Sequence, residues 1–280
     1  AGLGLLSYSA FSGAHNQYLD GIKQEYVALA WRFPFGTFAA AYTTLSSGDI
    51  DAYDENDMAI GKISTGHTMT VLSYAQSWPH FRKDAGKLDP MLITPNWTRI
   101  EPVPDYRPKA YRISAGGSVK KVSEELAGES ASAYAFDAGL TLVLPRHFHL
   151  GVSALNFGGK EKFVREAYSL PSSLRFGLAK DLHTVNDIMV FTVASDIVKY
   201  SDREYMSATG LEVDVMKMFQ LRLGYKTQKD SGSRVSGGFG LNFDRLADKN
   251  GFLRGARVDY SYIDYGSLGA TNRLGVQFIW

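Results

Sequence analysis

The sequence predicts an all-β protein, a transmembrane antiparallel up-and-down β-barrel of about 14 strands. Apolar and polar residues alternate with period 2 in segment after segment along the chain. No run approaches the roughly 18 apolar residues that a membrane-spanning helix needs. The connections between the alternating segments are short at one end and long at the other, which is typical of outer-membrane barrels rather than of soluble sandwiches.

The composition limits the classes of function. The 280 residues carry a formal net charge of +1, so no strongly basic face for nucleic acid is expected. The absence of cysteine excludes a disulfide framework and a thiol nucleophile. Aromatic residues (16 Tyr, 16 Phe and 4 Trp) and 28 Gly, without a long helical pattern, favour a β-rich architecture. No signal peptide is recognisable, which leaves open whether one was removed or lies before Ala1.

Each expected strand follows from one run of alternation. In the last run, 270–280, Leu274 and Val276 alternate with Arg273 and Gly275. The alternation is weak in the runs at 66–77, 188–199 and 205–214, so their faces stay undetermined. The expected strands, each roughly 8–12 residues long, are 4–10, 23–33, 37–46, 66–77, 110–121, 131–144, 147–157, 172–181, 188–199, 205–214, 217–226, 234–243, 255–263 and 270–280.

Charged residues fall on the glycine-rich faces of these strands. On a lipid face each Lys or Arg would cost about 2–4 kcal/mol at the bilayer midplane, whereas the polar interior of a barrel accommodates it. A soluble sandwich with one solvated face remains the alternative. The residues expected to face the lumen are Arg175, Arg222, Lys226, Arg257, Asp259, Arg273 and Gln277. Those expected to face lipid are Phe219, Leu221, Leu223, Tyr225, Val258, Tyr260, Leu274, Val276, Phe278 and Trp280.

The connections predict which end of the barrel faces which compartment. Tight links stand at Pro34–Gly36, at Pro145–Arg146 and near Met216. Because short turns lie on the periplasmic side of such barrels, the long polar connections are expected on the outside. These long connections are 11–22, 47–65, 122–130 and 158–171.

One connection breaks this pattern. The Pro-rich insertion at 79–109 lies on the periplasmic side, and its six prolines exclude a regular strand or helix. It is either a tolerated insertion or a docking surface for another protein, because long ordered loops are often functional. The residues proposed to bind such a partner are Trp78, Phe81, Pro90, Trp97, Pro104 and Tyr106.

Two clusters in the sequence contain residue types that bind metal ions. The loop 49–57 holds Asp49, Asp51, Asp54, Glu55 and Asp57, but its spacing does not match an EF-hand, so a solvated acidic loop is favoured over Ca²⁺ binding.

The second cluster is the pair His147 and His149, which has no third ligand near it in the sequence, so no metal is predicted there either. The stretch "GGFGLN" at 237–242 lacks the strand–loop–helix setting of a dinucleotide site. No G-x-S-x-G elbow is present. A non-enzymatic protein without a cofactor is therefore expected.

An ordered set of motifs resembles a known family. The set comprises "AGL" at the start, then "QEYVALAWRFPFGTFAAAYTTLSSGDI", "SAYAFDAGLTLVLP", "GVSALNFGG", "LPSSLRFGLAKDL", "GLEVDVMKMFQLRLGYKT" and "VDYSYIDYGSLGATNRLGVQF". It resembles the PorV/PorQ family of bacterial outer-membrane proteins, relatives of the FadL fatty-acid transporters. The opening residues look like the tail of an Asn-Pro-Ala-Gly-Leu motif, before which FadL-like proteins carry a plug. The resemblance implies a single fourteen-stranded FadL-like barrel over 1–280, a bacterial outer-membrane location and no catalytic residues.

The resemblance also implies a function. The first hypothesis is a protein-binding component of a secretion or surface-assembly complex of the type IX kind, with loops 11–22 and 47–65 contacting client or partner protein. The alternative is a FadL-like transporter, in which a hydrophobic small molecule leaves through a lateral gap in the wall. A general pore is the weakest hypothesis. The expected partners are outer-membrane lipid, other protein subunits, and a hydrophobic ligand or plug in the lumen.

The terminal run 270–280 completes the expected barrel. It should pair with 4–10, so that no strand edge remains. Trp280 should lie near the periplasmic interface, where Trp is enriched. A terminal aromatic residue also resembles the signal by which outer-membrane barrels are recognised for assembly.

Overall fold

The computed structural model is a closed antiparallel barrel of fourteen strands. It describes residues 1–18, 21–78, 111–126, 129–163, 166–184, 188–227, 234–243, 253, 255–265 and 269–280. Within this part of the chain, no helix is long and apolar enough to cross a membrane. The fourteen-strand closed barrel is thus the fold that the alternation predicts.

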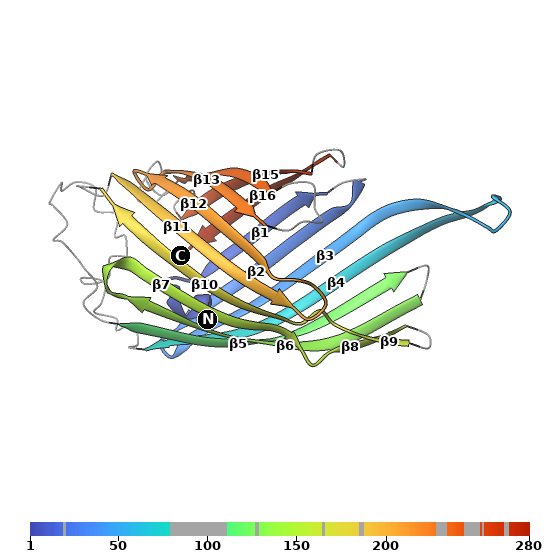
Figure 1. The fold of residues 1–280 in the computed structure, drawn as a ribbon, viewed down its shortest axis with the longest axis horizontal. Coiled ribbons are helices and arrows are strands. Elements are labelled where there is room, and N and C mark those ends of the chain that lie inside the picture. The colour runs from blue at the N-terminus through green and yellow to red at the C-terminus, as the bar shows by residue number, and fades with distance from the viewer. Residues whose placement is uncertain are drawn as a thin grey trace.

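The strands follow one another around the barrel in chain order (Figure 1). Among the described residues, one hairpin lies outside the ladder, formed by β8 (Lys160–Phe163) and β9 (Glu166–Ser169), so β7 pairs with β10. The barrel strands are β1 (Ala10–Gln17), β2 (Lys23–Phe33), β3 (Gly36–Tyr53), β4 (Ala59–Trp78), β5 (Arg112–Leu126), β6 (Glu129–Leu144), β7 (Phe148–Phe157), β10 (Ser173–His183), β11 (Met189–Tyr200), β12 (Met206–Val215), β13 (Phe219–Lys226), β14 (Val235–Asn242), β15 (Ala256–Asp264) and β16 (Ala270–Ile279).

The two ends of the barrel differ in their connections. We call the end that carries the turns after β2, β6 and β12 the short-turn end, and the opposite one the hairpin end. The turn after β6 is the short 3-10 helix η4 (Pro145–His147). Strand β4 ends and β5 begins at the short-turn end, and the insertion predicted between them at 79–109 lies outside the described residues. At the hairpin end, β3 and β4 project well beyond the neighbouring strands (Figure 1).

The strands are longer at the hairpin end than the sequence suggested. The connection expected at 47–65 is mostly strand, because β3 runs to Tyr53 and β4 begins at Ala59. The connection expected at 122–130 is likewise taken up by β5 and β6, and that at 158–171 contains β8 and β9. Strands β3 and β4 continue to pair with each other here, from Asp49 opposite Ser64 to Tyr53 opposite Ala59.

The first strand is displaced from its expected place. The segment 4–10 is not a strand: Gly2–Leu5 form a 3-10 helix, η1, and β1 begins at Ala10. The prediction was wrong because the start of this segment belongs to η1, which lies against the inner wall of the barrel instead of pairing in the ladder. The segment 11–22, expected as a loop, contains β1.

The segment η1 lies against the inner wall of β3, β4 and β5. Ser114 donates a hydrogen bond from Oγ to the carbonyl of Ala1, at 2.6 Å, and the guanidinium of Arg32 donates to the carbonyl of Leu6. A Cβ at Gly4 would collide with Ser114 Oγ and come within 2.9 Å of the Gln76 carbonyl carbon. Close approach to the wall therefore requires glycine here.

The barrel closes between β1 and β16. The register runs from Ala10 opposite Ile279 to Gln17 opposite Asn272. Ser9 and Trp280 extend it with two backbone hydrogen bonds, at 3.2 and 3.1 Å. The ring of Trp280 meets that of Trp31 edge-on, with centroids 5.9 Å apart. Closure thus uses the predicted last strand but a first strand that begins later than predicted.

The Trp31–Trp280 contact predicts a measurable coupling between closure and the aromatic band. W31A and W280A should each destabilise the barrel, and the double variant should lose about 0.5–1.5 kcal/mol less than the sum, because an edge-to-face pair contributes about that much beyond buried area. Urea titration in detergent, read by the heat-modifiable mobility of the folded barrel on gels, measures this. Strictly additive losses would show that the contact carries no energy.

Candidate functional site

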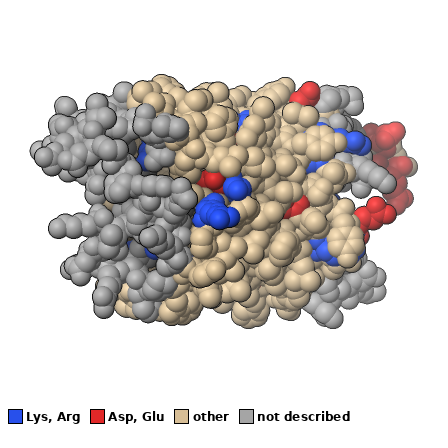
Figure 2. All heavy atoms as spheres, turned by 60° about the vertical axis from the view of Figure 1, so that its left-hand side comes forward, with Lys and Arg blue, Asp and Glu red and all other residues tan. Residues whose placement is uncertain are grey.

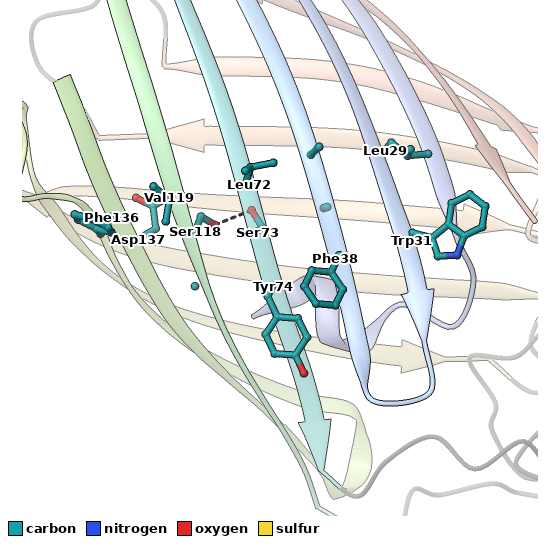
Figure 3. Close-up of a pocket in the computed structure, with 13 residues that line it drawn as sticks. Leu29, Trp31, Phe38, Leu72, Ser73, Tyr74, Ser118, Val119, Phe136 and Asp137 are labelled. Carbon is teal, nitrogen blue, oxygen red and sulfur yellow. Dashed lines mark hydrogen bonds between the residues drawn. The ribbon is translucent and has the colours of Figure 1, made fainter. Parts of the chain in front are cut away.

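An apolar groove of about 700 Å³ runs across the outer surface of β2–β6 towards the short-turn end (Figure 3). We call it the outer groove. The lining also includes four residues whose side chains the register turns to the inner face, namely Ala39, Ser73, Ser118 and Asp137. The outer-face residues that line it are Leu29, Trp31, Phe38, Ala40, Leu72, Tyr74, Gly117, Val119 and Phe136.

Two cross-strand rows produce this hollow. In one row Trp31 lies opposite Phe38, Phe38 opposite Tyr74, and Tyr74 opposite Gly117. The neighbouring row runs from Leu29 through Ala40, Leu72 and Val119 to Phe136. Small residues therefore stand beside large ones in both rows. The large side chains form the sides of the groove, and Ala40 and Gly117 leave its floor low.

Aromatic rings reinforce the end of the groove nearest the turn. Phe38 and Tyr74 have ring centroids 4.8 Å apart, and Phe33 packs on both Phe35 and Phe38. The Tyr74 hydroxyl donates to the carbonyl of Phe35, at 2.8 Å. This hydrogen bond ties the β2–β3 turn to β4, so the aromatic side of the groove is held in place.

On β3 and β4 the inner face behind the groove consists of small residues. Ala39, Ser73 and Ala75 face inward on β3 and β4, and Ser73 and Ser118 share a hydrogen bond of 2.8 Å (Figure 3). A Cβ at Gly116 would lie 2.7 Å from the Cβ of Ala75. The helix η1 packs on the inner side of these same strands, where the inward side chains are short.

The opposite sector carries charge on its inner face. Arg222 bonds Glu212 and, at 2.6 Å, Asp259; Arg257 bonds Asp259 at 2.9 Å. A lumenal pocket of about 540 Å³ lies over this cluster, and Arg273 contributes to its lining. Three of the residues predicted to face the lumen are therefore in one network.

The remaining residues of that prediction are dispersed. Arg175 lies 3.9 Å from Asp196, and both are substantially exposed. Lys226 is 5.4 Å from the ring of Tyr265 near the hairpin end. Gln277 lies opposite Arg257 in the β15–β16 register. Together with the Arg222 cluster, these positions line one face of each strand.

A further inner-face network was not predicted. Lys120 bonds Asp137 at 2.7 Å and Asn156 at 2.9 Å, and the Asn156 amide donates to Asp137. The β6–β7 register shifts here, between Phe136 and Ala138. The sequence placed Asp137 in a regular alternation, and nothing in that pattern signals the bulge that brings Asn156 to it.

The residues predicted to face lipid form the opposite face of their strands. Leu221 and Leu223 are 59 % and 63 % exposed, whereas Gln220, on the lumenal face of the same strand, is buried. Phe219, Tyr225, Leu274, Val276 and Trp280 are exposed as well, and Val258, Tyr260 and Phe278 are half-buried. These exposed fractions refer to the barrel alone.

The residues predicted to bind a protein partner are mostly outside the described structure. Only Trp78, the last residue of β4, is described, and it is exposed. Phe81, Pro90, Trp97, Pro104 and Tyr106 lie outside the described residues.

The acidic loop at the tip of β3–β4 is organised by its own backbone. Asp54 accepts hydrogen bonds from the amides of Met58 and Asn56, at 2.9 and 2.8 Å, and these bonds lower the pKa of Asp54. In the described part of the chain these carboxylates are not in any group of three converging metal ligands. The geometry is that of a self-capped polar turn.

One constellation resembles a hydrolytic triad in composition but not in order. Asp181 accepts hydrogen bonds from Thr192, at 2.8 Å, and pairs with His149 at 3.1 Å. The carboxylate therefore stands between the hydroxyl and the imidazole, whereas a catalytic base must itself contact the nucleophile. The hydroxyl–imidazole contact of a hydrolytic triad is therefore missing between Thr192 and His149.

Comparisons with known proteins place the fold but not the family. No protein-family model and no curated protein matches the chain. Among solved structures, the toluene transporter TodX of Pseudomonas putida is similar with a TM-score of 0.54 and 10 % identity, over 98 % of this chain and 88 % of that one. The outer membrane protein Omp33 of Acinetobacter baumannii has a TM-score of 0.52 and 11 % identity, over 99 % of this chain and 100 % of that one. The PorV/PorQ resemblance gains no support from these comparisons.

The two inner-face arginine sites predict different costs of substitution. R222M leaves Glu212 and Asp259 on one wall without their shared cation and should cost about 1–3 kcal/mol. R175M removes an exposed, long ion pair and should cost at most about 1 kcal/mol. Urea titration in detergent measures both losses. Equal losses would contradict the assignment of the Arg222 network as the structural one.

Proposed function

We propose that this chain is a non-enzymatic outer-membrane transporter of small hydrophobic molecules. The closed barrel leaves no unpaired strand edge, the condition for a sheet in lipid. Its outer face is apolar while its arginines and carboxylates point inward, and aromatic rings gather near the short-turn end, as at a membrane interface. TodX, to which the fold is similar, is a toluene transporter, which agrees with this function.

The observation that carries the proposal is the outer groove with η1 behind it. An apolar molecule dissolved in the bilayer gains contact with Leu29, Leu72 and Phe136 there without loss of hydrogen bonds. In the floor of the groove the outward residues Ala40 and Gly117 are small, and so are the inward residues Ala39 and Ser73 beside them, so side chains add little to the thickness of the wall there. This sector is where a hydrophobic substrate passes between lumen and membrane.

Passage through this sector requires a movement of the wall. The β3–β4 register is continuous from Thr37 opposite Ala75 to Ser46 opposite Gly66, and β4–β5 is continuous throughout. The lateral gap expected from the sequence is therefore absent from the described part of these strands. Small side chains lower the packing that must be broken when two strands separate, and η1 is the inner element whose displacement accompanies such an opening.

Filling the groove tests this function. A40F places a ring in the floor of the groove, and uptake of toluene by cells that depend on this barrel should fall several-fold. G237F is the matched control: Gly237 is on the outer face of β14, where a new Cβ meets only Arg222 O, at 3.9 Å. G237F should leave uptake unchanged. Heat-modifiable mobility confirms that both variants fold.

Three results would contradict the transporter function. Equal uptake by A40F and the unmodified chain would remove the groove from the path. Equal loss in both variants would indicate a general effect on the membrane. A large, steady conductance in planar bilayers, insensitive to A40F, would indicate a general pore instead.

A second function, binding of another protein at the cell surface, has one observation in its favour. The β3–β4 hairpin projects beyond the barrel, and Figure 2 shows acidic side chains gathered at the hairpin end. Such a projection is accessible to a partner in a secretion or surface-assembly complex. A photo-crosslinker at Glu55 should then capture one defined protein in cells. Crosslinks to lipid alone, or none, would exclude this role.

A further inference from the structure

Four side chains with metal-binding chemistry meet at the short-turn end of the lumen. His149 on β7 and Asp181 and His183 on β10 share the inner face, since the register sets their outward neighbours Leu150 and Leu182 on the other side. His147 joins them from η4, the turn between β6 and β7. Residues separated by more than thirty positions thus converge on one place.

The distances are those of a near-formed site. One ligand atom each of His147, Asp181 and His183 lies within 4.8 Å of the other two. The rings of His147 and His183 have centroids 4.3 Å apart. Ligands of a tetrahedral zinc ion are about 3.3 Å apart, since Zn–N distances are about 2.0–2.1 Å. The ligand atoms must therefore move closer by side-chain rotation to reach this spacing, and His183 is the exposed member of the three.

We infer that this cluster binds a divalent transition-metal ion of the zinc class through His147, Asp181 and His183. Two imidazoles and one carboxylate bind zinc-class ions in preference to Mg²⁺ or Ca²⁺, because Mg²⁺ and Ca²⁺ take oxygen ligands. Three protein ligands leave one coordination position open to water or to a solute in the lumen.

His149 and Thr192 orient the carboxylate in this site. One oxygen of Asp181 accepts a hydrogen bond from Thr192 Oγ1, at 2.8 Å. The other oxygen is hydrogen-bonded to His149 Nε2, at 3.1 Å. Partners of this kind hold a metal-ligating group in place, and their loss typically weakens metal binding about 10–100-fold. His149 is thus a positioning residue rather than a required ligand.

A bound ion would connect the β6–β7 turn to the end of β10. His147 belongs to the β6–β7 turn, and Asp181 and His183 end β10. Arg146 and His147 both have positive φ, 64° and 61°, but Met216 and Lys217 adopt the same conformation in the β12–β13 turn. The positive φ angles are therefore common to two short turns of this barrel and are no sign of a metal site. The evidence for the site is the convergence of the ligands. The inference holds whether or not the barrel transports.

Cobalt titration of the full purified chain in detergent tests the site. One equivalent of Co²⁺ should give visible d–d absorption bands, and Zn²⁺ should displace it. H183A and D181N should weaken binding at least about tenfold, and H149Q should weaken it while the one-to-one stoichiometry remains. H67A is the matched control, because His67 pairs with Glu124, at 3.0 Å, away from this cluster. Its Co²⁺ binding should match that of the unmodified chain.

The folded state of each variant is checked by its heat-modifiable mobility. H147N supplies a second ligand deletion if H183A does not fold, because Asn tolerates the left-handed conformation of this position. Absence of Co²⁺ bands in the unmodified chain, binding that survives both H183A and H147N, or an equal loss in H67A would overturn the inference.

Discussion

Closure of the hydrogen-bonded ladder is the constraint on which the rest of this structure depends. In a bilayer an unpaired backbone amide costs several kcal/mol, so a sheet is stable there only if its first and last strands pair. Here β1 and β16 do so over eight residue pairs, and the Ser9–Trp280 bonds extend the seam. Every other feature is an adjustment to a ring of strands that must close.

Closure of fourteen strands creates a second requirement, because the resulting lumen is too wide for ordinary wall side chains to fill. The chain meets it in two ways. Around β12–β15 long charged side chains reach inward and pair with one another, as Arg222 does with Glu212 and Asp259. Towards the short-turn end of β3–β5 the inward side chains, such as Ala75 and Ser114, are small, and η1 lies against them instead. The two sectors have opposite composition for the same physical reason.

The sequence predicted what depends on alternation and missed what depends on register. Period 2 determines the faces of a strand, which is why residues such as Arg222 and Leu223 could be assigned to opposite faces of β13 in advance. It does not show which residues of neighbouring strands lie side by side. The outer groove requires Ala40 to stand beside Leu72, and the metal cluster requires His147 to meet His183. Both follow from cross-strand pairing and from a turn. Segment 4–10 shows the converse error, since its apolar pattern predicted a wall strand but its start forms η1 against the inner wall.

The composition of the small sector also explains why the outer and inner features coincide there. A helix can approach a strand wall only where inward side chains are short, and Ser114 and Gly116 provide this. A hollow forms on the outside only where outward side chains are short, as at Ala40 and Gly117. Since inward and outward residues alternate, a run of small residues along β3–β5 produces both features at once. Thinness on both faces is therefore a single property of the sequence. In the charged sector, by contrast, paired side chains such as Arg222 and Asp259 project from the inner face, and the wall there is thicker by the length of those side chains.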